Sequence, residues 1–98
     1  EILNDEKVPN FSLAIARVKP GVTTQLHALH GIEETYIVCK GSGIAEVNNV
    51  THEMKYMDKL VIPKDHEQRI INTGKGDLEF FCICTPRFVP ESYIKRGL

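Results

Sequence analysis

The chain has 98 residues, enough for one small hydrophobic core, and we expect residues 1–98 to form a single domain. Hydrophobic residues make up 42% and charged residues 26%, as in ordinary globular proteins. The net charge of −1 gives no electrostatic reason to expect nucleic acid or an anionic membrane as a partner, and the apolar runs are too short to span a bilayer.

Three cysteines, Cys39, Cys82 and Cys84, lie inside apolar runs. Their odd number argues against a closed disulfide framework. Free cysteine is among the most buried residue types, so we expect all three to be reduced core residues. This pattern predicts a cytoplasmic protein.

Short apolar and β-branched runs recur along the chain, and turn residues separate them. The expected strands are residues 11–18, 24–29, 35–39, 44–47, 51–55, 59–62, 68–71 and 78–85. Asn48 and Asn49 tolerate positive φ and predict a two-residue hairpin. Only residues 90–96 look helical, with Pro90 suited to a first turn. Many short strands with frequent turns are typical of an all-β sandwich or barrel.

The stretch LHALHGIEE, residues 26–34, holds His27, His30 and Glu34. On a helix these three side chains would lie at i, i+3 and i+7. That helix would place Gly31 in its interior, at a cost of about 1 kcal/mol relative to alanine, and β-rich segments flank it on both sides. We therefore expect this stretch not to be helical.

Within this all-β pattern the sequence resembles the cupin family. The spacing from Gly21 to His27, and from Glu34 to Gly41, matches the first cupin motif. Residues 34–43, ETYIVCKGSG, closely resemble the strand and turn at the centre of that motif.

Residues 57–72 resemble the second cupin motif, with Pro63 and Asn72 in register. The resemblance covers residues 11–89. It implies an all-β jelly-roll, the cupin β-barrel, here followed by a short C-terminal helical turn.

Four positions depart from the cupin pattern. Leu29 and Gln68 stand where the motifs have histidine, and Met57 and Asp65 stand where the second motif has glycine. Glycine is valued there for backbone freedom, and Asp tolerates the left-handed conformation better than most residues. We therefore expect Met57 and Asp65 to occupy turns and to have no catalytic role.

Cupin histidines and glutamate point into the barrel and bind one divalent metal, which the resemblance carries over to His27 and Glu34. Strand alternation places Glu34 and Tyr36 on one face. A buried carboxylate is costly unless a metal ion or a protonated histidine pairs with it. Gln68 either ligates through its amide oxygen, which suits harder cations, or hydrogen-bonds within the barrel.

His30 has two interpretations. Gly31 could bend the strand end and swing the His30 ring inward, which would complete a set of two histidines and one carboxylate with His27 and Glu34. The alternative is a solvent-facing turn histidine. His66, in the loop before Gln68, either rims the barrel or faces water.

Two functions from different classes follow from the resemblance. The first is a metal-dependent oxygenase or isomerase acting on a small polar substrate, in which His27, Glu34, Gln68 and His30 hold a divalent ion (Fe, Mn, Ni or Zn) and Tyr36 lines the pocket. The second is a non-catalytic module that binds a small sugar or acid without metal. Cupins host both classes, so fold does not decide between them.

Aromatic residues near the two chain ends predict a homodimer. They are Phe11, Phe80, Phe81, Phe88 and Tyr93. They offer more aromatic surface than so small a core needs, and small cupins usually dimerise through their terminal strands.

Overall fold

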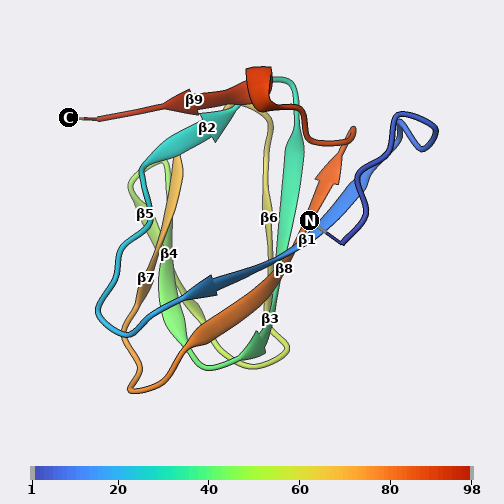
Figure 1. Ribbon diagram of the computed structural model, residues 1–98. Helices are drawn as coiled ribbons and strands as arrows, with labels where there is room; N and C mark the ends of the chain where they lie inside the picture. The colour runs from blue at the N-terminus through green and yellow to red at the C-terminus, as the bar shows by residue number, and fades with distance from the viewer. Residues whose placement is uncertain (1, 98) are drawn as a thin grey trace.

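The computed structural model describes residues 2–97, which form two antiparallel sheets facing each other (Figure 1). The elements are β1 (Ser12–Val18), β2 (His27–Leu29), β3 (Glu33–Lys40), β4 (Gly43–Val47), β5 (Val50–Met54), β6 (Lys59–Ile62), β7 (Gln68–Asn72), β8 (Leu78–Thr85), η1 (Pro90–Ser92) and β9 (Tyr93–Lys95). The sheet orders are β1-β8-β3-β6 and β5-β4-β7-β2-β9. The jelly-roll predicted from the sequence is confirmed.

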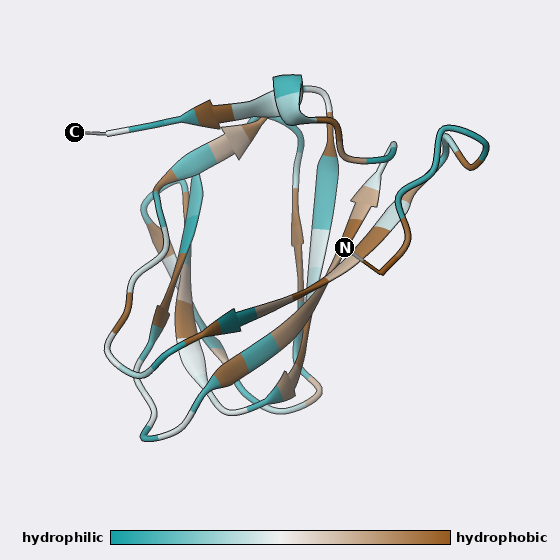
Figure 2. Cartoon of the chain, in the orientation of Figure 1, coloured by the Kyte–Doolittle hydropathy of each residue, from teal (hydrophilic) through white to brown (hydrophobic). Residues whose placement is uncertain are grey.

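The core lies between the two sheets because successive strand residues point to opposite faces. Along β3, Glu34, Tyr36 and Val38 are buried, whereas the residues between them are more exposed. Figure 2 shows β3 hydrophilic where it begins and hydrophobic further along. The main core cluster comprises Val18, Tyr36, Val38, Ala45, Val47, Met54, Ile62, Ile70, Leu78 and Phe80.

Several turns depend on residues with positive φ. Asn48 (φ 48°) and Asn49 (φ 68°) form the predicted hairpin between β4 and β5. Met57 (φ 72°) and Asp65 (φ 65°) occupy turns as expected at the positions where cupins have glycine. The chain therefore keeps the left-handed turn conformation without the residue that adopts it most easily.

The C-terminal helical turn is shorter than residues 90–96. It is confined to Pro90–Ser92, and Tyr93–Lys95 continues as β9. β9 pairs with β2 through His27–Lys95, Ala28–Ile94 and Leu29–Tyr93. These interstrand hydrogen bonds outweigh the local tendency to continue a helix. Within residues 2–97, no helix is long and apolar enough to cross a membrane.

Candidate functional site

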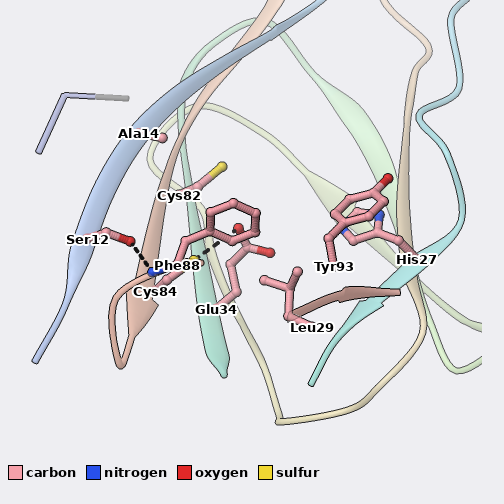
Figure 3. A pocket seen from close by; sticks show the side chains of 9 residues that line it. All are labelled: Ser12, Ala14, His27, Leu29, Glu34, Cys82, Cys84, Phe88 and Tyr93. Atoms are coloured by element: carbon pink, nitrogen blue, oxygen red, sulfur yellow. Dashed lines mark hydrogen bonds between the residues drawn. The ribbon is translucent and has the colours of Figure 1, made fainter. Parts of the chain in front are cut away.

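A cavity of about 220 Å³ lies at one end of the sandwich, where β2 and β9 cross it at the top of Figure 1. Figure 3 shows the lining side chains, which come from β1, β2, β3, β8, β9 and the segment between β8 and η1. They are Ser12, Ala14, His27, Leu29, Glu34, Cys82, Cys84, Phe88 and Tyr93.

The cavity exists because inward-facing side chains become smaller toward this end. On β1 the inward series runs from Val18 through two alanines to Ser12. On β8 it runs Leu78, Phe80, Cys82, Cys84. The two strands pair antiparallel, with Ser12 opposite Cys84 and Val18 opposite Leu78. The small residues of both strands therefore meet at the same end and leave space that larger side chains would fill.

Glu34 is the acidic group of this cavity. It lies on β3, only 7% of its surface is exposed, and it pairs across the sheet with Cys84. The Cys84 thiol lies 3.7 Å from Oε2 of Glu34 (Figure 3). A carboxylate this deeply buried is expensive to place and marks a candidate functional group.

A hydrogen bond and an aromatic contact fix the orientation of the His27 ring and leave Nε2 available as an acceptor. Its Nδ1–H donates to the carbonyl of Gln25 at 2.8 Å, because a carbonyl oxygen can only accept, and Nε2 keeps its lone pair. The ring stacks on Tyr93, with centroids 4.6 Å apart and planes 14° from parallel. Burial lowers the pKa of His27, and the bond to Gln25 opposes this only in part. His27 therefore offers a neutral proton acceptor at neutral pH.

Tyr36 and Gln68 join the two sheets beneath this site. Both are buried, and the Tyr36 hydroxyl donates a hydrogen bond to Oε1 of Gln68. Burial first, and the charge of Glu34 second, raise the pKa of Tyr36 well above its ordinary value. Gln68 lies opposite His27 across the β2–β7 pair. Tyr36 packs in the core against Phe80 rather than among the described cavity-lining residues, so its role in substrate binding stays a prediction.

His30 lies apart from these residues. Its side chain is 78% exposed, and Nδ1 lies 2.7 Å from Oδ1 of Asp65. The hydrogen bond from His30 is the main reason that the pKa of Asp65 is lowered. Gly31 forms a turn with φ 72°, but Leu29, 3% exposed, takes the inward position, so the structure shows the solvent-facing alternative for His30.

The side chains that the resemblance assigns to a metal ion do not form a preassembled metal site among the described residues. Within residues 2–97, no three His, Cys, Asp or Glu side chains are grouped as a metal site requires. Of the donors predicted from the resemblance, His27 and Glu34 share the cavity, while the amide oxygen of Gln68 already accepts from Tyr36. Metal binding by these side chains stays a prediction, which the titration proposed below tests.

Sequence reasoning missed six of the lining residues: Ser12, Ala14, Cys82, Cys84, Phe88 and Tyr93. Cys82 and Cys84 were predicted as reduced core residues; neither forms a disulfide, and they lie two residues apart on the same face as Phe80. The alternation of residues along this strand could have predicted that both cysteines face into the barrel. Phe88 and Tyr93 carried no comparable local signal, because contacts distant in sequence fix their positions.

The cupin family matches most of the chain. A sequence profile described as the cupin domain matches residues 14–84. The uncharacterized protein MJ1618 from Methanocaldococcus jannaschii is 34% identical over 80 residues, which cover 82% of this chain and 64% of that protein. The chain thus spans less than two thirds of that relative.

Solved structures share the fold. A predicted oxalate decarboxylase from Thermotoga maritima is 28% identical with a TM-score of 0.72, over 76% of this chain and 65% of that chain. A conserved protein with a double-stranded β-helix domain from Klebsiella pneumoniae subsp. pneumoniae is 14% identical with a TM-score of 0.85, over 99% and 81%. With sheet order, motif residues and profile in agreement, the chain belongs to the cupin family.

Proposed function

We propose that this cupin domain binds a small, mostly apolar organic molecule in the cavity between its sheets, without a resident metal ion. One observation carries the proposal: a cavity of about 220 Å³ with mainly apolar walls, among whose lining residues are the polar side chains of Glu34 and His27. Apolar concavities with a few well-placed polar groups are the usual form of small-molecule sites.

Both polar groups are able to move protons. Neutral His27 accepts a proton at Nε2, and the Glu34 carboxyl group exchanges one with a bound molecule. An isomerase or lyase that works by proton transfer is the catalytic form of this proposal, and a binding module is its non-catalytic form. The similarity to the predicted oxalate decarboxylase supports a small-molecule site of either form.

The alternative is the metal-dependent oxygenase or isomerase, with His27, Glu34 and Gln68 holding Fe, Mn, Ni or Zn. A titration of each ion against melting temperature, with protein purified without a metal-affinity tag, separates the two. An ion at a hundred times its dissociation constant would stabilise the protein by about 2.7 kcal/mol. We expect no shift with any ion. A shift that Glu34→Gln abolishes and Glu33→Gln retains would favour the metal-dependent enzyme.

The cavity itself is tested with small neutral probes, namely phenol, indole and benzyl alcohol. We expect backbone amide signals of Glu34, Cys84 and Phe88 to shift on titration, because these residues line the cavity. Ala14→Leu, which fills the space, should remove the response. Probe-induced shifts confined to residues outside the cavity would contradict the proposal.

We further propose that a second copy of the chain covers the outer face of the β1-β8-β3-β6 sheet. Outward-facing side chains form two mostly apolar rows in register across this sheet. One row runs Leu13, Ile83, Thr35 and Val61, and the other runs Ile15, Phe81, Ile37 and Lys59. Ile15 is 46% exposed and Val61 is 50% exposed. Apolar patches of this kind mark protein interfaces.

The aromatic residues on which the dimer prediction was based lie in different parts of the structure. Phe80 is 3% exposed in the core and Phe88 lines the cavity, whereas Phe81 faces outward. The rim of the outer face carries both signs, with Arg17 near Glu79, which suits a self-complementary twofold contact. Sedimentation at micromolar concentration should give a dimer, and Ile15→Glu should give a species near 11.1 kDa. A monomeric wild-type protein would contradict this assignment.

A further inference from the structure

Two exposed apolar side chains are neighbours in the turn between β5 and β6. Tyr56 is 68% exposed and Met57 is 67% exposed, more than any other large hydrophobic residue described. Gly43 pairs with Met54 and with Asn72, so the β3–β4, β5–β6 and β7–β8 connections lie together at the end of the sandwich opposite the cavity, at the bottom of Figure 1 and here called the closed end. Such a pair of exposed apolar residues is a candidate contact with another molecule.

Backbone hydrogen bonds hold this turn in one conformation. The Asp58 N–H donates to the Lys55 carbonyl at 2.8 Å, and the Lys55 N–H donates to Oδ2 of Asp58 at 2.9 Å. The Met57 N–H donates to the Val38 carbonyl, and the Val38 N–H donates to the Asp58 carbonyl, both at 2.9 Å. Tyr56 and Met57 therefore lie on an ordered support, and a partner that binds them loses little entropy in ordering the backbone.

Met57 is an unfavourable residue for its own turn. Its φ of 72° lies in the left-handed region that glycine adopts most easily. Its side chain is mostly exposed, so packing within the chain offsets little of the cost of that conformation. Residues held in sparsely populated backbone regions cluster at functional sites, and this position therefore points to a role outside the fold.

The closed end carries an excess of positive charge. The segments that build it contain six basic and four acidic side chains in a chain whose net charge is −1; they are residues 17–22, 38–43, 53–59 and 72–79. Two of the acids lie in ion pairs at 3.4–3.8 Å, namely Arg17–Asp77, Arg17–Glu79 and Lys40–Glu79. Among residues 2–97, the other four basic side chains of these segments form no ion pair; they are Lys19, Lys55, Lys59 and Lys75. An acidic partner would complement their charges.

A hollow of about 340 Å³ opens beside the turn. Its lining includes Ser42, Ile44, Lys55 and Thr73, and Glu53 is the one acidic residue among its described lining residues. Because Lys55 belongs both to the hollow and to the turn, the two features form one continuous surface. The surface thus combines projecting apolar side chains, an adjacent concavity and a charged rim, as protein interfaces do.

We infer that the closed end is the docking surface for a partner protein, which binds through an acidic segment that carries at least one large apolar side chain. Tyr56 and Met57 contact the apolar side chain, and Lys55 and Lys59 on either side of them attract the acidic residues. Tyrosine is enriched among the residues that dominate binding energy at interfaces, and methionine is enriched in interface cores. This surface is separate from the cavity and from the outer sheet face, so the inference depends on neither proposal.

A library of random short peptides displayed on phage tests the chemistry of the partner. We expect the peptides selected by the wild-type protein to be enriched in Asp and Glu around a Leu, Phe or Trp. Dissociation constants of the synthesised peptides are then measured by fluorescence anisotropy at low and high salt. Affinity should fall as the salt concentration rises, because salt screens charge pairs at an exposed surface.

Matched variants assign the binding to the turn. Tyr56→Ser should weaken binding at least about tenfold, a loss of about 1.4 kcal/mol. Val50→Ser, which replaces another exposed apolar residue at the opposite end of β5, should leave it unchanged. Met57→Gly should weaken binding without lowering the denaturation midpoint, because glycine suits this turn, and this separates a lost contact from lost folding. Lys55→Gln combined with Lys59→Gln should lower both the affinity and its salt dependence.

Two further measurements exclude other occupants. All these variants should sediment like the wild-type protein, and Lys95→Gln, on β9 at the opposite end, should bind the peptides like the wild type. Selected peptides without an acidic excess, affinities that Tyr56→Ser and Met57→Gly leave unchanged, or a library that yields no binding peptide would each overturn the inference. Binding to phosphatidylserine vesicles without any selected peptide would overturn it in favour of a lipid surface. A wild-type dimer that Tyr56→Ser dissociates would overturn it in favour of a second copy of the chain.

Discussion

Strands β1, β3 and β8 run the length of one sheet, and their two ends hold different kinds of side chain. At the closed end, Val38 and Leu78 are fully buried in the main core cluster. At the open end the same strands present Ser12, Glu34 and Cys84 to a cavity. The strands stay in register from the open end as far as Val38, and the β3–β8 register shifts between Val38 and Lys40, so the difference at these inward positions comes from side-chain volume and polarity. The cavity therefore exists because a few inward positions at this end hold small side chains.

The largest expected effect contrasts truncations at the two ends. Leu78→Ala should lower the free energy of unfolding by about 3 kcal/mol, because it opens a cavity in packed core. Cys82→Ala, on the same strand but facing space that already exists, should lower it by about 1 kcal/mol or less. Urea denaturation measures both. Equal losses would show that the two ends are packed alike.

Enlarging two alanines on β1 tests the same contrast in the opposite direction. Ala16 packs against the core cluster, so Ala16→Leu should overpack it and lower the free energy of unfolding by about 1–3 kcal/mol. Ala14 lines the cavity, so Ala14→Leu should change stability by less than about 1 kcal/mol and abolish probe binding. Denaturation and probe titration of each variant provide the comparison. Probe binding that survives Ala14→Leu would place the ligand elsewhere.

His27 should make the open end sensitive to pH. Burial lowers the pKa of His27 in the folded protein below the ordinary value of 6.5, so the unfolded chain binds the proton more tightly. Stability should fall as the pH drops below about 6.5 and level off once the pH passes below the folded-state pKa. Denaturation midpoints measured from about pH 5 to about pH 8 should show this slope. His27→Gln should remove it, and His66→Gln should not.

The smallest effects concern two turns at opposite ends. The Met57 N–H bonds to the carbonyl of Val38 near the closed end, and the Asp65 N–H bonds to the carbonyl of Leu29 near the open end. Met57→Gly should relieve a left-handed conformation and raise stability by up to about 1 kcal/mol, whereas Met57→Ala should not. Asp65→Gly should be nearly neutral, because Asp tolerates this conformation better. Melting temperatures test both, and probe affinity should stay within about tenfold of wild type.

Strands whose boundaries depend on local signals were predictable. Lys59–Ile62 and Leu78–Thr85 have the bounds expected from their apolar runs and flanking turns. β9 was missed because its three residues gain their conformation from β2, more than 60 positions away in sequence. The local sequence after Pro90 favours a helix, and it is the pairing with β2 that makes Tyr93–Lys95 a strand.

The sequence predicted site residues only where the alternation of inward and outward side chains along a strand determines their direction. Glu34 and Gln68 face inward as the strand pattern requires, and Leu29 replaces a histidine in an inward position. The place of Phe88 depends on a hydrogen bond to Ser12, 76 positions away. The place of Tyr93 depends on the β2–β9 pair. These contacts join segments that are distant in sequence, and neither segment's local sequence predicts them. Phe88 and Tyr93, which were expected at a dimer interface, therefore line the cavity instead.

The two three-residue strands that carry His27 and Tyr93 form the least anchored wall of the cavity. β9 has β2 as its single neighbour in the sheet, and β2 contributes few hydrogen bonds to β7. In terms of hydrogen exchange, such a unit opens locally at much lower free energy than the centre of a sheet. Deuterium should therefore enter the amides of Ile94 and Lys95 well before those of β3 and β8. An occupant stacked against Tyr93 would slow that entry, and the exchange rate of one edge strand would then report directly on occupancy.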